Sequence, residues 1–167
     1  MEWTYAKPDA DVPVHYQKLL GLWTGFVSFA GSSESTRMCI AVAIQAVSAD
    51  GTATAQFAWN LGDGIESPNQ VSKGVSQWQA RNLVLLPEKG EQLVFASIAP
   101  YRGKWYRYML DLPTAAEPNT IRGYLYGTQH GSATDLSVGA WKDFVEAHRV
   151  TLRRQGDSSV PFPIPIN

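Results

Sequence analysis

Apolar and polar residues alternate along most of the chain, with the period of two that is typical of half-buried β-strands. Thr52–Asn60 is the clearest case; its apolar positions are Ala53, Ala55, Phe57 and Trp59. The pattern predicts eight or so strands, because it contains nine strand-like segments of which some are short. These segments are Leu22–Phe29, Arg37–Ser48, Thr52–Asn60, Gly74–Arg81, Leu83–Leu86, Gln92–Ile98, Lys104–Leu112, Thr120–Thr128 and His148–Arg154.

Short turn sequences separate these strands. The strongest is Ala49–Gly51, where Asp-Gly stands between two strand-like runs, a combination that favours a tight β-hairpin. Further turns or loops are predicted at Leu61–Lys73, Glu88–Gly90, Arg102–Gly103 and Ala115–Asn119. Because no helices alternate with the strands, the order of elements predicts an antiparallel all-β fold.

Two short helices are predicted beside the strands. Pro13–Leu20 begins with a proline and is followed by Gly21, which are a typical start and stop. Ser137–Ala147 precedes the last strand, and four of its apolar residues have helical spacing: Val138, Trp141, Phe144 and Val145. Residues 1–12 are predicted to form an arm, and the proline-rich residues 156–167 an extended tail.

The length of 167 residues suits one domain, predicted over residues 1–155. A chain of this size can bury a core without metals or disulfides. Strands in hairpin order and close to eight in number favour an antiparallel up-and-down β-barrel, with the short helices near the N-terminus and before the last strand. A β-sandwich is the alternative that the same pattern leaves open.

The segment Leu20–Gly25, Leu-Gly-Leu-Trp-Thr-Gly, resembles the Gly-x-Trp signature of the calycin superfamily of lipocalins, fatty-acid-binding proteins and avidins. The resemblance implies that Trp23 packs across one barrel end and that Arg153 or Arg154, from the last strand, lies over its ring. A guanidinium stacks favourably on an indole face. The Thr-Asp-Tyr motif of lipocalins has no match, so the resemblance is to a distant lipocalin-like or avidin-like barrel.

The segment Ala140–Lys142 is similar to the avidin segment whose tryptophan reaches the biotin of a neighbouring subunit. The polar residues that bind biotin in that family have no counterpart here. The alternative interpretation of Trp141 is a helix residue that packs on the barrel.

Charge and cysteine content bear on the class of protein. Lysine and arginine number 14 against 15 acidic residues, so the chain lacks the basic excess of a nucleic-acid-binding protein. The single cysteine, Cys39, cannot form an internal disulfide and is predicted to be a buried, inert thiol. We see no signal peptide and no apolar run near the roughly 20 residues of a membrane helix. We expect a cytoplasmic protein that neither binds nucleic acid nor inserts into a membrane.

No spacing typical of a catalytic or metal site is present. The three histidines, His15, His130 and His148, lie far apart, and one cysteine is too few for a thiolate zinc site. We therefore predict no metal and no cofactor, with each histidine structural or at the surface. A constellation assembled by folding stays open.

Aromatic residues carry the functional prediction. The chain has six Trp, seven Tyr and six Phe, and many of them lie on predicted strands. The candidate ligand-binding residues are Phe57, Trp59, Trp78, Trp105, Tyr106, Tyr108, Tyr124 and Tyr126.

Two strand registers are open. In the first, the tyrosine pair Tyr106 and Tyr108 faces inward beside Tyr124 and Tyr126, which would create a pocket with apolar walls and hydroxyl groups. In the second, the interior is lined by Trp105, Arg107 and Met109 and favours an anionic head group. Aromatic packing with no ligand is the third alternative.

We expect the barrel to bind a small hydrophobic or amphipathic, mostly apolar ligand. The first alternative is an isomerase, cyclase or hydrolase that uses the same cavity through Tyr106, Tyr124, Asp111 or His130. The second is an interaction module that forms a homo-oligomer through the apolar tail and the aromatic arm Trp3–Tyr5.

Overall fold

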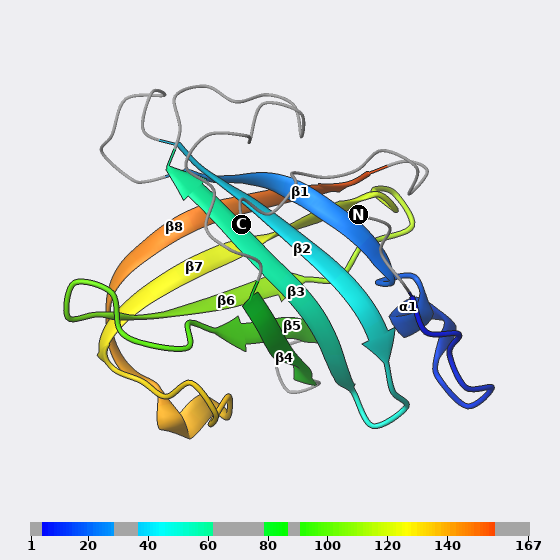
Figure 1. Cartoon of the computed structure of the whole chain (residues 1–167), viewed down its shortest axis with the longest axis horizontal. Helices are drawn as coiled ribbons and strands as arrows, with labels where there is room; N and C mark the ends of the chain where they lie inside the picture. Colours follow the sequence, from blue (N-terminus) through cyan, green and yellow to red (C-terminus); the bar gives the residue numbers. More distant parts are fainter. Residues whose placement is uncertain (1–4, 29–36, 62–78, 87–90, 156–167) are drawn as a thin grey trace.

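Eight antiparallel strands pair in sequence order, and β8 returns to pair with β1, which closes the sheet into a barrel (Figure 1). This computed structural model describes residues 5–28, 37–61, 79–86 and 91–155. The strands are β1 (Gly21–Ser28), β2 (Arg37–Val47), β3 (Thr52–Leu61), β4 (Gln79–Leu86), β5 (Gln92–Ala96), β6 (Trp105–Asp111), β7 (Thr120–His130) and β8 (Lys142–Arg154). The predicted up-and-down barrel is confirmed, and the sandwich alternative is wrong.

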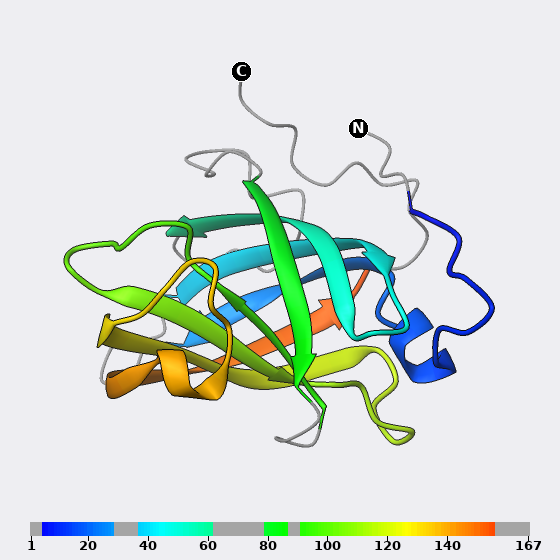
Figure 2. The ribbon, with the colours of Figure 1, turned by 90° about the horizontal axis from the view of Figure 1, so that it is seen from below.

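The two ends of the barrel differ in what lies on them. The helix α1 (Val14–Gln17) lies at one end, and the 3-10 helix η4 (Val138–Ala140) lies at the other, as both ribbon views show (Figures 1 and 2). We call the first the plugged end, because Trp23 lies there. The second, which carries the β5–β6 loop 97–104 and the β7–β8 loop 131–141, is called the loop end.

The β2–β3 hairpin forms at the Asp-Gly turn, as predicted. The Ser48 N–H donates to the Thr52 carbonyl (2.9 Å), and the Asp50 carboxylate accepts from the Thr52 N–H (3.0 Å) and hydroxyl (2.7 Å). These contacts involve only residues close in sequence, which explains why this turn is readable from the sequence.

Trp23 closes the plugged end. Its side chain is fully buried, and its indole N–H donates to the Leu19 carbonyl (2.8 Å). The Arg154 guanidinium lies 4.3 Å above the centre of the ring and also donates to the carbonyls of Leu20 and Lys18. The predicted packing of Trp23 beneath a basic residue of the last strand is confirmed, and that residue is Arg154.

A short helix precedes the last strand as predicted, but it is much shorter than Ser137–Ala147. Only Val138–Ala140 is helical, and Lys142 already begins β8. The apolar residues have helical spacing but do not share one helix face: Trp141 packs beneath Arg107, whereas Phe144 lies on β8 and contacts Tyr126 in a tilted arrangement, with 4.7 Å between ring centres.

Two further boundaries differ from the prediction. The N-terminal helix covers Val14–Gln17 only, rather than Pro13–Leu20. The strand predicted at Leu83–Leu86 belongs to β4, which begins at Gln79. The part of the predicted strand Gly74–Arg81 that precedes Gln79 lies outside the described residues.

Candidate functional site

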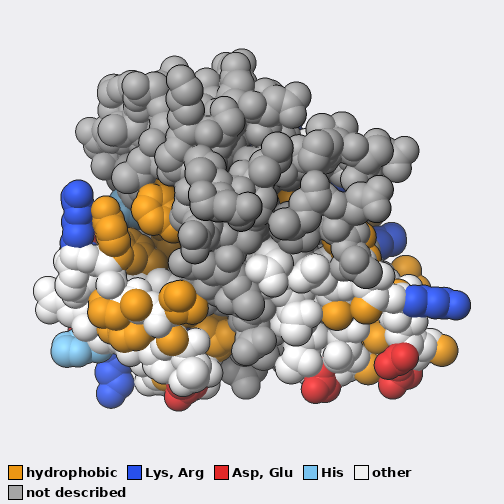
Figure 3. Space-filling view, viewed as in Figure 1, with side chains coloured by type: hydrophobic (Ala, Val, Ile, Leu, Met, Phe, Trp, Pro, Cys, Tyr) orange, Lys and Arg blue, Asp and Glu red, His pale blue; other side chains and the backbone are white. Residues whose placement is uncertain are grey.

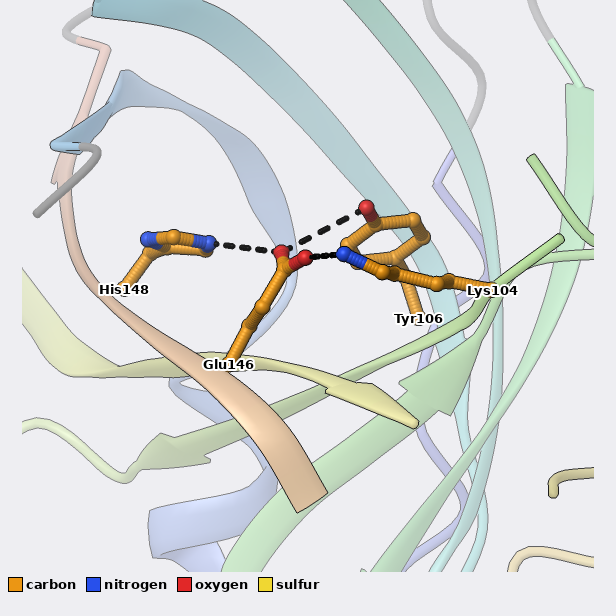
Figure 4. Close-up of polar contacts among 4 residues, drawn as sticks. All are labelled: Lys104, Tyr106, Glu146 and His148. Carbon is orange, nitrogen blue, oxygen red and sulfur yellow. Dashed lines mark hydrogen bonds and ion pairs between the residues drawn. The ribbon is translucent and has the colours of Figure 1, made fainter. Parts of the chain in front are cut away.

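Four polar side chains meet inside the barrel wall at the loop end, and we call them the polar cluster (Figure 4): Lys104, Tyr106, Glu146 and His148. The carboxylate of Glu146 is the centre of the polar cluster. One of its oxygens pairs with the Lys104 ammonium. The other accepts from His148 Nε2 (3.0 Å) and makes a longer contact with the Tyr106 hydroxyl (3.5 Å). Each donor thus faces a carboxylate oxygen.

A glycine in the intervening strand allows this meeting. In the register of the sheet, Tyr106 on β6 pairs with Gly127 on β7, and Gly127 pairs with Glu146 on β8. A Cβ at Gly127 would lie 3.2 Å from Tyr106 Cε1 and 3.2 Å from Glu146 Cβ. Tyr106 and Glu146 therefore contact each other across β7 because Gly127 has no side chain.

Partial burial shapes the ionisation of the polar cluster. The side chains of Lys104, Glu146 and His148 are 35%, 23% and 10% exposed, so they are only partly withdrawn from solvent. Burial lowers the pKa of His148, and the neighbouring Lys104 charge lowers it further. Burial raises the pKa of Tyr106. Near neutral pH the polar cluster therefore contains one cation, one anion, a neutral imidazole and a protonated phenol.

The depressed pKa of His148 predicts a pH-dependent stability. As pH falls below the ordinary histidine value near 6.5, the unfolded chain takes up a proton at His148 that the folded protein does not. The free energy of unfolding should therefore fall between about pH 7.5 and about pH 5, and it should fall less in His148→Gln. Urea unfolding of both proteins at the two pH values measures the difference. His130→Gln, which removes an exposed imidazole, is the control. Equal pH dependence in wild type and His148→Gln would contradict the assignment.

Aromatic rings form the apolar layer beneath the polar cluster. Phe95 and Tyr108 stack at 4.5 Å, and Phe57 contacts both at 5.6 and 5.5 Å between ring centres. All three are buried in the core of the barrel. In the sheet register, Tyr108 pairs with Leu125, which pairs with His148, so this layer lies directly next to the polar cluster.

A second aromatic contact lies at the loop end itself. Trp59 on β3 packs edge-on against Tyr101 of the β5–β6 loop, with 6.2 Å between ring centres. The backbone N–H of Tyr101 donates to the Lys104 carbonyl, and the Lys104 N–H donates to the Tyr101 carbonyl. The same loop therefore carries the Tyr101 ring and the Lys104 ammonium. Exposed hydrophobic residues of the same loop, Ile98 and Tyr101, retain 56% and 44% exposure. The space-filling view shows hydrophobic side chains and basic groups on the side where these loops lie (Figure 3).

The structure separates the predicted ligand-binding residues into three groups. Those that belong to the core or pack against it are Phe57, Trp59, Tyr106 and Tyr108. Those outside the core are Trp105, which lies next to Gly131 and Trp141, and the outer-face pair Tyr124 and Tyr126. Trp78 lies outside the described residues. Among all of these, Tyr106 is the member of the polar cluster.

The first predicted arrangement is correct for β6, where Tyr106 and Tyr108 face inward, and wrong for β7, where Tyr124 and Tyr126 face outward. The second, with Trp105, Arg107 and Met109 inside, is wrong. Met109 pairs with Tyr124, and Tyr108 pairs with Leu125, so the inward tyrosines of β6 face small or aliphatic residues of β7. Tyr124 instead points outward and is 41% exposed.

Arg107 is buried on the outer side of β6, not in the interior. It donates to the carbonyls of Leu136 (2.8 Å) and Ser137 (3.2 Å), and its guanidinium lies 5.5 Å from the ring centre of Trp141. Trp141 donates to the Asp135 carbonyl (2.9 Å) and is itself buried, so it packs on the barrel. These contacts hold the β7–β8 loop against the barrel wall.

The candidates for catalysis do not converge. Tyr124 is on the outer face, Asp111 is exposed and accepts from the Gln92 amide (2.8 Å), and His130 is exposed at the end of β7. Tyr106 alone of the four belongs to the polar cluster. In the described ranges, no group of three or more histidine, cysteine or acidic side chains is arranged to hold a metal ion.

Sequence reasoning missed Lys104, Glu146 and His148 as a group. The signal was present for two of them, because Glu146 and His148 continue the alternation of Val150 and Leu152 backwards along β8. The helix assigned to this segment hid that alternation. Lys104 carries no such signal, since its role comes from an ion pair between the β5–β6 loop and β8, with Glu146 42 positions away in the sequence.

Comparison of the chain with protein-family models, with curated proteins and with solved structures finds no match in any of the three. Across the described residues, no helix has the length and apolar character needed to span a bilayer.

Proposed function

We propose that this barrel binds a small, mostly apolar molecule at its loop end. The observation that carries the proposal is the polar cluster next to the buried aromatic residues Phe57, Phe95 and Tyr108. Moving a polar group out of water is unfavourable unless the group is hydrogen-bonded in the protein. Aliphatic side chains at the same positions would fill the interior without this cost. A few convergent polar groups beside apolar and aromatic walls are the usual composition of a ligand site.

The two kinds of surface suit the two ends of an amphipathic ligand. Trp59 and Tyr101 offer aromatic faces for its apolar part. The polar cluster offers the Tyr106 hydroxyl and the Lys104 ammonium as donors and the Glu146 carboxylate as an acceptor for its polar end. Since Tyr101 and Lys104 belong to the same β5–β6 loop, binding of the apolar part of the ligand at Tyr101 would place its polar end near Lys104.

We also propose a distant relationship to the calycin superfamily. It is supported by eight antiparallel strands in sequence order and by the Trp23–Arg154 stack at the plugged end. This relationship favours ligand binding, because calycin barrels commonly take small hydrophobic molecules. A cytoplasmic location remains part of the same proposal.

The binding test uses the full chain with a panel of hydrophobic fluorescent dyes and fatty acids. We expect quenching of tryptophan fluorescence and a rise in the melting temperature for at least one compound, because a ligand that binds only the folded state stabilises it. Tyr106→Phe should weaken that binding by about fivefold, the effect of one lost hydrogen bond of about 1 kcal/mol.

Tyr124→Phe is the matched control, since it removes the same hydroxyl from the outer face of the barrel. It should leave the affinity unchanged. The absence of quenching and of a thermal shift across the panel would refute ligand binding, and equal effects of the two substitutions would refute the placement at the polar cluster.

A second candidate function is acid–base catalysis on the bound molecule. The specific observation is the contact of the Glu146 carboxylate with the His148 imidazole (3.0 Å), beside the phenol of Tyr106. Mass spectrometry of the ligand after prolonged incubation distinguishes the two functions, because a binding protein returns the ligand unchanged.

A further inference from the structure

Among the residues that the structure describes, the charges of the polar cluster cancel. Lys104 and Glu146 form a direct ion pair, and they are the cation and the anion of the polar cluster. The other members, Tyr106 and His148, add hydrogen-bonding groups without net charge near neutral pH. Arg102, farther out on the same loop, lies over the exposed Tyr101 ring, where solvent and salt screen its charge.

A charged ligand group would disturb this balance. A carboxylate drawn to Lys104 would lie beside Glu146, and an ammonium drawn to Glu146 would lie beside Lys104, in a site that is partly withdrawn from water. Either arrangement brings like charges together and leaves one of the three charges unpaired, which is costly at partly buried positions. An uncharged group with both a donor and an acceptor avoids that cost, because it can accept from Tyr106 or Lys104 and donate to Glu146.

We propose that the ligand of this barrel has an uncharged polar end that both donates and accepts hydrogen bonds, such as an alcohol or a primary amide. The inference rests on the proposed function and specifies its ligand class. It follows from the direct Lys104–Glu146 pair and from the position of that pair inside the barrel wall (Figure 4).

The first experiment compares four probes with the same alkyl chain: dodecanol, dodecanamide, dodecanoate and dodecylamine. Their affinities for the full-length protein are measured near neutral pH by displacement of a bound fluorescent dye. Dodecanol and dodecanamide should bind about tenfold more tightly than the two charged probes, which corresponds to about 1.4 kcal/mol. Tighter binding of either charged probe to the wild type would overturn the inference while leaving ligand binding intact.

The second experiment removes one charge of the ion pair at a time. Glu146→Gln leaves the Lys104 ammonium without its partner, so the preference should move toward dodecanoate. Lys104→Met leaves the Glu146 carboxylate without its partner, so the preference should move toward dodecylamine. Opposite shifts of about tenfold or more in the ratio of the two affinities are expected, since each variant exposes one uncompensated charge to the ligand.

Arg102→Gln is the control for Lys104→Met, because it removes an exposed cation from the same loop without breaking the ion pair. It should leave the order of the four probes unchanged. If neither charge removal shifts the preference, or if Arg102→Gln shifts it as strongly as Lys104→Met, the ion pair does not select the ligand and the inference fails. If no probe or dye binds the wild type, the proposed function itself fails. The wild-type ranking decides the inference even where a variant does not fold.

Discussion

Replacing Trp23 by alanine should lower the free energy of unfolding by about 3–5 kcal/mol, the range for removal of a buried large aromatic side chain. The indole is fully buried at the plugged end and holds the Leu19 carbonyl through its N–H. Its loss leaves a cavity there and removes the face on which the Arg154 guanidinium stacks. Urea unfolding followed by circular dichroism measures the change.

Two variants make the interpretation specific. Trp23→Phe keeps most of the ring but removes the N–H donor, so it should cost less than the alanine variant and should still fold. Trp105→Ala removes a tryptophan that is only partly buried and lies outside the core, so its cost should also be smaller. A loss below about 1 kcal/mol for Trp23→Ala would show that Trp23 does not stabilise the plugged end.

The second large effect is expected at Gly25, where the backbone of β8 leaves no room for a side chain on β1. An alanine Cβ there would lie 1.8 Å from the Thr151 carbonyl oxygen and 2.9 Å from Leu152 Cα. Both atoms belong to the backbone of β8, and the β1–β8 pairing closes the barrel. Because backbone cannot move aside as a side chain can, Gly25→Ala should cost about 3 kcal/mol or more and reduce the yield of folded protein.

Gly139→Ala is the control for Gly25→Ala. An ideal Cβ at Gly139 meets no atom within 4 Å, so the same added methyl group should change stability by no more than about 0.5 kcal/mol. Thermal unfolding of the two variants beside the wild type measures the contrast. Equal stabilities of the two variants would contradict the close approach of β1 and β8 at Gly25.

Features that depend on neighbours in sequence were predictable. The Asp50–Gly51 turn holds its own hydrogen bonds, and the alternation of Ala53, Ala55 and Phe57 places one face of β3 in the core. Trp23 was predicted through a resemblance, and the structure then selected Arg154 over Arg153. The selection follows from the alternation of side chains along β8, since Arg154 follows the buried Leu152 on the same face.

The candidate site was predictable only in part. Tyr106 was identified because aromatic residues cluster on β6, but its partners are charged residues that are brought to it by the register of three strands. A shift of that register by one residue would turn Tyr106 outward, and no local signal specifies it. The outward direction of Tyr124 shows the same effect, since its spacing from Tyr126 is identical to that of Tyr106 from Tyr108.

The amino-acid sequence by itself determined the β-rich class, the order of most strands and the hairpin at Asp50–Gly51. These depend on alternation and turn chemistry, which act over a few residues. Only the tertiary structure decided which faces of β6 and β7 point inward and that Lys104, Tyr106, Glu146 and His148 meet. Closure of the barrel fixes the register of β6, β7 and β8 through contacts between segments that are distant in sequence. Gly127 lets Tyr106 and Glu146 meet only because β6 and β8 lie on its two sides.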